Sequence, residues 1–267
     1  MTAAVYAAFV RNKFLESLAY RARFLVGLPS YVIFVGVHYA IWRAVYASGP
    51  GAEIAGYDLG QIVTYASVAW LVRSFYFSTV DQDIAAEIRQ GDIVRHLLRP
   101  IDYQLARMAE SFGESAFRLL ALTAPSAAVV YLLFPVAAPA GWAAAAGFVV
   151  SLVLSFVVFF EISYLAGLTA AFTEQADGVL RAKTAAFELL SGFLVPLAFF
   201  PGWARPVLAW LPFRAVADVP LNIYVGRYSG GTLWLMLGVQ AAWALVLYGA
   251  GRLAWWSVVR RLTIQGG

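Results

Sequence analysis

Long apolar stretches alternate with short polar ones from one end of the chain to the other. Six of the apolar stretches approach or exceed the roughly 20 residues that an α-helix needs to cross a bilayer core about 30 Å thick. They cover about residues 24–46, 59–80, 111–134, 141–172, 184–200 and 232–258. The pattern therefore predicts an all-α membrane protein with six transmembrane helices in one domain, residues 24–267.

Residues 1–23 precede the first of these stretches and contain only short apolar patches. In a helical conformation, Phe14, Leu15 and Leu18 fall on one face of this segment. The opposite face carries Asn12, Lys13, Glu16, Ser17 and Tyr20. Such a two-sided helix is typical of a segment that lies along the membrane surface, so we expect an interfacial helix here. A charged flank of the first span is the alternative.

The longest polar interval, residues 81–110, separates the second span from the third. One face of a short helix within it carries Ile93, Val94, Leu97 and Leu98, and the other face carries Arg95, His96 and Arg99. Gly91 is expected to end the preceding helix, Asp92 to cap the next one and Pro100 to stop it. A short amphipathic helix between two long apolar helices is suited to contact a membrane surface or a groove in a partner protein.

Residues 201–231 are rich in proline and aromatic residues, and no apolar stretch among them is long enough to cross the membrane. The prolines are Pro201, Pro206, Pro212 and Pro220. This pattern predicts short helices at, or dipping into, the aromatic-rich membrane interface. We expect them to form external re-entrant helices between spans five and six.

The distribution of lysine and arginine predicts the orientation of the chain. One set of loops carries twelve: Arg11, Lys13, Arg21, Arg23, Arg89, Arg95, Arg99, Arg107, Arg181, Lys183, Arg260 and Arg261. The other set carries four: Arg43, Arg205, Arg214 and Arg227. Because cytoplasmic loops carry the excess of positive charge, both termini and residues 81–110 are expected in the cytoplasm.

The amino-acid composition excludes several classes of function. With 62% hydrophobic and 13% charged residues, the chain is too apolar for a soluble domain. A pI near 9.4 is compatible with nucleic-acid binding. In a membrane protein, however, an excess of arginine more often reflects the positive charge of cytoplasmic loops, so no nucleic-acid partner is expected. The absence of cysteine excludes disulfides, thiolate metal sites and a cysteine nucleophile.

Several ionisable residues fall inside the predicted spans, where each charge is costly to bury. They are Arg73, Glu114, Arg118, Glu161 and Glu188, and all lie in the cytoplasmic third of their spans. Opposite charges at similar depth predict ion pairs, for example Arg73 with Glu161 or with Glu188. Such pairs either stabilise the helix bundle or form a hinge near an inner gate. Arg252, near the end of the last span, is expected to extend its side chain to the interface.

Motifs for chemistry on this chain are few. The sequence has no phosphate-binding loop of the GxxxxGK[ST] type and no HExxH or GxSxG motif. The acid cluster Asp81, Asp83, Glu87 and Asp92 could hold Mg²⁺ for a membrane-embedded prenyl- or phospho-transferase. It lacks DxxxD spacing, and no second acidic motif accompanies it. A small secondary transporter is a further alternative, although the chain shows no inverted repeat.

The order of these elements and two sequence motifs resemble the permease subunit of type-2 ABC transporters. Residues 88–104, IRQGDIVRHLLRPIDYQ, are similar to the coupling region of one bacterial branch, which reads roughly I-x-x-G-x-[LI]-x-x-x-L-L-[RK]-P. The matching positions are Ile88, Gly91, Ile93, Leu97, Leu98, Arg99 and Pro100. The motif PGW…LPF…DVPLNIYVG, residues 201–226, resembles the external segment of that branch more loosely. The resemblance covers essentially the whole chain.

The resemblance implies a transport subunit without enzymatic activity, in the bacterial cytoplasmic membrane, that exports its substrate. Two permeases, identical or paired with a sister subunit, would associate with cytoplasmic ATPase subunits that bind ATP and Mg²⁺, and this chain would carry no cofactor or metal. The ATPase-coupling residues would be Gly91, Asp92, Ile93, Val94, Leu97, Leu98, Arg99 and Pro100. The loop at residues 173–183 is a second, smaller contact candidate.

Overall fold

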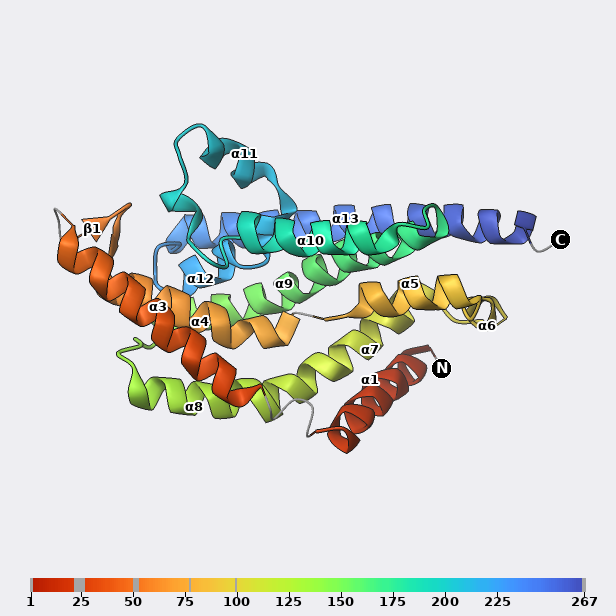
Figure 1. Ribbon diagram of the computed structural model, residues 1–267, viewed down its shortest axis with the longest axis horizontal. Helices are drawn as coiled ribbons and strands as arrows, with labels where there is room; N and C mark the ends of the chain where they lie inside the picture. Colours follow the sequence, from red (N-terminus) through yellow and green to blue (C-terminus); the bar gives the residue numbers. More distant parts are fainter. Residues whose placement is uncertain (1, 22–26, 50–52, 77, 99, 266–267) are drawn as a thin grey trace.

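The computed structural model describes residues 2–21, 27–49, 53–76, 78–98 and 100–265. Most residues of this part of the chain are helical, so the predicted all-α architecture is confirmed. The molecule is elongated, and most helices run along its long axis (Figure 1). Both termini and helix α6 (Val94–Leu97) lie toward one end, which we call the α6 end. The two-residue antiparallel strands β1 (Glu53–Ile54) and β2 (Tyr57–Asp58) lie at the other, the hairpin end.

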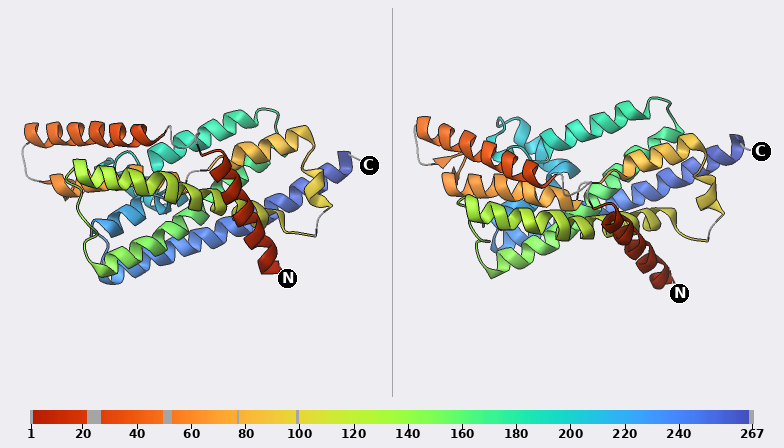
Figure 2. Two further views of the ribbon diagram at one scale, coloured as in Figure 1. Left: turned by 90° about the horizontal axis from the view of Figure 1, so that it is seen from below. Right: turned by 60° about the horizontal axis from the view of Figure 1, so that its bottom comes forward.

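Four helical stretches in the described part of the chain are long and apolar enough to cross a membrane. They are α3 (Leu28–Ser48), the stretch Tyr103–Leu133, α9 (Trp142–Leu168) with a short 3₁₀ extension to Ala171, and α13 (Gly230–Gln265). Helices α4 (Leu59–Tyr76) and α10 (Ala176–Leu190) run in the same bundle but are not among the four (Figure 2). Six membrane spans therefore remain a prediction.

The stretch Tyr103–Leu133 starts earlier than the predicted third span at residue 111. It consists of α7 (Tyr103–Arg118), a π-helical turn (Leu119–Thr123) and α8 (Ala124–Leu133). The helix starts early because the carboxylate of Asp102 accepts a hydrogen bond from the backbone N–H of Leu105 at 3.0 Å. Pro125, which has no N–H to donate, follows the wider π-helical turn, and the stretch continues without a break.

The predicted fifth span, residues 184–200, is wrong in its boundaries. Helix α10 begins at Ala176, and the residues expected to form a polar loop lie in its first turns, where Lys183 is buried. The helix ends at Leu190, and residues 191–196 are not helical. Gly192 adopts a positive φ of 81°, a conformation that glycine tolerates best and that does not continue a helix.

Helix α4 lies in the core of the bundle, with most of its side chains buried. Its Tyr76 packs against Phe159 of α9 and Phe187 of α10, with ring centroids 5.8 Å apart in both pairs. On the other side of α9, an added Cβ at Gly147 would lie 2.9 Å from the Leu233 side chain of α13, so the two helices approach closely. Because α4 is shielded by its neighbours, it does not need the uniformly apolar surface of a lipid-facing helix.

Helix α1 (Thr2–Ala19) crosses α7 at a close contact. A Cβ at Gly113 would collide with the backbone carbonyl of Val10, and the rings of Phe14 and Phe117 meet edge to face with centroids 5.7 Å apart. Ser17, expected on the exposed polar face, is buried, whereas Leu15 and Leu18 are exposed. The predicted helix is present, and its exposed apolar residues remain open to a membrane surface.

Residues 201–231 form short helices, as predicted: α11 (Ala204–Trp210), a 3₁₀ turn (Pro212–Ala215) and α12 (Asp218–Tyr224). Helix α12 is buried throughout, whereas α11 stands at the surface of the bundle (Figure 1). Four tryptophans in this segment and at the starts of α9 and α13 are exposed: Trp142, Trp203, Trp210 and Trp234. Exposed tryptophans are typical of the boundary between membrane and water.

Candidate functional site

The predicted coupling region forms a corner between α5 (Val80–Gln90) and α7. Helix α5 ends where predicted, at Gly91, which adopts a left-handed φ of 76° and donates its N–H to the carbonyl of Ile88 at 3.2 Å. The chain then makes the single turn of α6, and α7 begins at Tyr103. Arg99 lies outside the described residues.

The helix predicted over residues 92–99 is much shorter in the structure. α6 spans Val94–Leu97, and its N-cap residue is Ile93, without a side-chain hydrogen bond. The predicted cap at Asp92 is wrong, because the Asp92 carboxylate contacts the guanidinium of Arg95 at 3.0 Å instead. One turn closed by backbone bonds from Val94 to Gly91 and from Arg95 to Asp92 replaces a regular amphipathic helix.

The apolar face predicted for this helix is divided between the core and the surface. Ile93 is fully buried in a cluster formed by residues of α5, α7, α9 and α13. Leu97 is half-buried, Val94 is exposed and Leu98 is 81% exposed. His96, expected on the outer polar face, instead turns inward. Ile93 thus anchors the corner in the core, whereas Val94 and Leu98 present apolar side chains at its surface.

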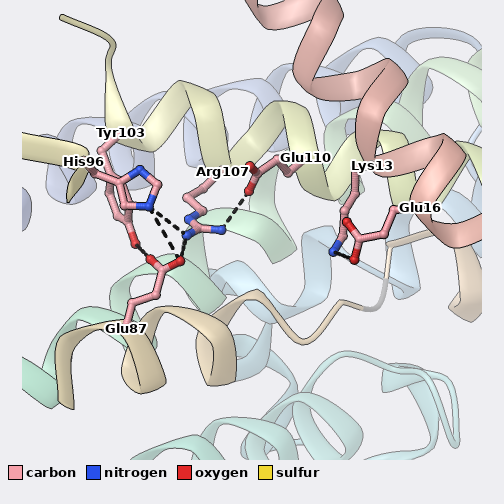
Figure 3. A network of polar contacts seen from close by, with 7 residues as sticks. All are labelled: Lys13, Glu16, Glu87, His96, Tyr103, Arg107 and Glu110. Carbon is pink, nitrogen blue, oxygen red and sulfur yellow. Dashed lines mark hydrogen bonds and ion pairs between the residues drawn. The ribbon is translucent and has the colours of Figure 1, made fainter. Parts of the chain in front are cut away.

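A polar network fixes the inner side of this corner (Figure 3). Glu87 of α5 accepts a hydrogen bond from the Tyr103 hydroxyl at 2.8 Å and forms an ion pair with Arg107. His96 of α6 lies 3.7 Å from the Glu87 carboxylate and 5.1 Å, centroid to centroid, from the Tyr103 ring. Arg107 also pairs with Glu110 at 2.7 Å. The network therefore joins α5, α6 and α7, and the helical stretch that begins with α7 continues through α8 to Leu133.

A buried ion pair joins the start of α5 to the rest of the bundle. The Asp81 carboxylate lies 2.7 Å from the Lys183 ammonium of α10, with side chains only 3% and 7% exposed. The Lys183 ammonium also donates to the Ser163 hydroxyl of α9 at 3.2 Å and lies 5.1 Å from the centroid of the Phe159 ring. At Gly167 an added Cβ would lie 2.9 Å from the Asp81 carbonyl oxygen, so α5 and α9 approach closely. The sequence pattern placed Asp81 in an acid cluster and did not predict its pairing with Lys183.

The acid cluster is not assembled into a metal site. Asp81 and Glu87 each have a separate cationic partner, Lys183 and Arg107, and Asp92 contacts Arg95. Among the described residues, no group of three or more His, Cys, Asp or Glu side chains is placed to hold a metal ion.

The charges predicted inside the spans are brought together in part. Arg73 of α4 lies 3.3 Å from the Glu188 carboxylate of α10. Glu161 of α9, the other partner considered for Arg73, instead accepts a hydrogen bond from the Gln104 amide at 2.7 Å. Glu114 and Arg118 form an ion pair one turn apart on α7.

Arg252 of α13, expected to extend to the interface, forms an ion pair with Asp102, the residue that caps α7. Sequence reasoning missed both Asp102 and Gln104. The spacing of Asp102 before a helical pattern was the signal available for the first, since aspartate is a preferred N-cap residue.

These observations first define a class: a multi-pass helical membrane protein in which many of the described charged side chains pair with one another. The family follows from sequence comparison. The chain belongs to the ABC-2 transporter family, since residues 32–266 match the family model described as ABC-2 family transporter protein. It is therefore a permease component of an ABC transporter. Comparison with characterised proteins and with solved structures gives no significant match.

Proposed function

We propose that this chain is the membrane-spanning subunit of an ATP-driven exporter in a bacterial cytoplasmic membrane. It pairs with a second permease, identical or a sister subunit, and couples to two separate ATPase subunits that bind ATP and Mg²⁺. Helices α4 and α10 complete six spans, and α11 and α12 form the external re-entrant segment. Family membership supports the permease role, and the finer assignments rest on the geometry of the corner.

The arrangement of the termini supports a cytoplasmic α6 end. The N-terminus, the C-terminus and α6 lie toward the same end of the molecule (Figure 1). The loops and terminal segments that the sequence predicts to be cytoplasmic carry twelve lysines and arginines, against four in the other loops and flanks. By the positive-inside rule, this distribution supports a cytoplasmic position for the α5–α6 corner, within reach of an ATPase.

The observation that carries the proposal is the exposed apolar pair Val94 and Leu98 on a corner held firmly from within. Ile93 is buried beneath them, and the Glu87–Arg107 pair ties α5 to α7. A partner can shift the conformation of the bundle only through contacts that differ between its states. Exposed apolar side chains on a fixed base are suited to that contact, and α7 extends from the corner into the membrane.

Replacing Leu98 by aspartate tests this assignment. Because Leu98 is already exposed, L98D should leave insertion and folding unchanged but place a charge in the contact with the ATPase. Tagged wild-type chain is purified from its native membrane with its ATPase, which is identified by mass spectrometry. We expect L98D to reduce the ATPase that co-purifies by about tenfold, equivalent to a loss of about 1.4 kcal/mol in binding.

Gln90→Asp is the matched control, because it adds the same charge at an exposed position just before Gly91 without removing an apolar contact. Q90D should retain the ATPase. Equal retention by L98D and wild type would remove the docking assignment while leaving the family membership intact.

A further inference from the structure

Two cavities at the α11 side of the molecule share a wall. The first, about 210 Å³, is polar and is lined by Tyr57, Asn222, Tyr228 and three arginines, Arg205, Arg214 and Arg227. The second, about 420 Å³, is apolar and lies between α11 and α13, against Trp210, Trp243 and Val246. Ala209 and Arg214 line both cavities, so the polar one opens beside the apolar one.

The polar cavity carries an excess of positive charge. Arg214 is paired at 3.2 Å with Asp218, the one carboxylate among the described residues of this lining. The Nε atom of Arg205 donates to the Phe200 carbonyl at 2.7 Å, and Arg227 donates to the Gly56 carbonyl. Across the part of the chain that the structure describes, neither Arg205 nor Arg227 forms an ion pair. Three guanidinium groups thus surround one carboxylate, which leaves charge for an anionic ligand.

The lining of this cavity is held in place by buried contacts. The Tyr57 hydroxyl, from β2, donates to the Asn222 side chain at 2.6 Å, and the Asn222 amide donates to the Asp218 carbonyl at 2.8 Å. The Arg227 guanidinium stacks on the Tyr57 ring at 4.0 Å. Burial and the neighbouring Asp218 raise the pKa of Tyr228 to about 12, so its hydroxyl stays neutral. A ligand would therefore meet a lining that is already ordered, at little ordering cost.

We propose that the two cavities together bind an anionic amphiphile, with a phosphate headgroup between Arg205, Arg214 and Arg227 and an acyl chain between Trp210 and Trp243. Guanidinium groups bind phosphate with strong charge-assisted hydrogen bonds. The adjoining apolar cavity faces α13, one of the helices suited to contact lipid. Charge complementarity in one cavity and continuity with the other identify a lipid rather than a free anion. This binding requires no ATPase and does not rest on the proposed coupling.

Native mass spectrometry of the purified full chain tests the proposal. The chain in detergent is offered dioleoyl-phosphatidylglycerol, dioleoyl-phosphatidylcholine, dioleoylglycerol or inorganic phosphate. We expect phosphatidylglycerol to be retained at least about tenfold better than phosphatidylcholine, whose headgroup carries a cation, because net charge decides binding at the arginines. Dioleoylglycerol should not be retained. Competition by inorganic phosphate at a concentration equal to that of the lipid would point to a soluble ligand and overturn the lipid assignment.

Matched variants separate the two parts of the site. Combining Arg205→Gln with Arg227→Gln should reduce phosphatidylglycerol retention about tenfold, whereas Arg43→Gln, at an exposed arginine of α3, should not. Trp210→Ala should weaken retention, because Trp210 lines the apolar cavity. Trp203→Ala should not, because Trp203 is not among the described residues of that lining, although the two side chains are 81% and 80% exposed.

Ala242→Trp fills the apolar cavity and provides a second test of the acyl site if Trp210→Ala fails to fold. Equal losses in the arginine variants and Arg43→Gln would overturn the headgroup site. Cross-linking of Trp210 positions between two copies of the chain would assign the apolar cavity to a dimer contact instead.

Discussion

At the α6 end, charged side chains contact one another across helices, whereas in the polar cavity at the α11 side Arg205 and Arg227 form no ion pair within the described residues. The α6 end joins α5, α6 and α7 through Glu87 and Arg107, and joins α5 to α10 through Asp81 and Lys183. Its outer surface is apolar at Leu98. The difference indicates that the α6 end is a connected block suited to transmit displacement. The polar cavity, in contrast, has arginine side chains available to a ligand.

Removing one partner of the buried pair between Asp81 and Lys183 should destabilise the α6 end most strongly. Asp81→Asn leaves the Lys183 ammonium buried without its counter-charge, which should lower the free energy of unfolding by about 3–5 kcal/mol. Thermal unfolding of the full chain in one detergent provides the measurement. The double variant, with Lys183→Met added, should recover most of this loss because no unpaired charge remains. If the double variant is as unstable as Asp81→Asn, the two side chains do not act as a pair.

A second test asks whether α1 belongs to the connected block. Gly113→Ala places a Cβ against the Val10 carbonyl, which should force α1 away from α7 and lower the free energy of unfolding by about 1–3 kcal/mol. Hydrogen exchange across α1 should increase. Gly178→Ala is the control, because its Cβ meets no neighbouring atom in α10 and helix propensity favours alanine. Unchanged protection of α1 in Gly113→Ala would exclude α1 from the block.

The existence of the helices followed from hydrophobic periodicity, but the way the α6 corner packs did not. Periodicity alone placed Ile93 and Leu98 on one apolar face, yet one is fully buried and the other is 81% exposed. The face is divided because α6 has only one turn and is oriented by tertiary contacts of Ile93 and His96 with α5 and α7. A helical wheel assumes a longer regular helix and contains no information on such contacts.

Similar reasoning explains the misplaced fifth span. Lys183 is a loop residue by polarity, but inside the fold its charge is balanced by Asp81, about 100 residues earlier in the sequence. A hydropathy profile treats every charged residue as unfavourable in the membrane at its own position. It does not include the stabilisation by an opposite charge that is distant in the sequence. The polar cavity at the α11 side was missed for the same reason, because Tyr57 and Arg227 come from segments that are distant in sequence.

The smallest expected effect concerns the middle of the molecule, where α4 meets α10. Arg73 and Glu188 are 3.3 Å apart, but their side chains are 22% and 40% exposed, so the pair should contribute only about 0–1 kcal/mol. A double-mutant cycle with Arg73→Met and Glu188→Gln, read by thermal unfolding, measures this coupling. A parallel cycle with Glu161→Gln should show none, since Glu161 contacts Gln104. A coupling of about 3 kcal/mol or more between Arg73 and Glu188 would extend the connected block to the bundle centre, because only a well-shielded pair couples so strongly.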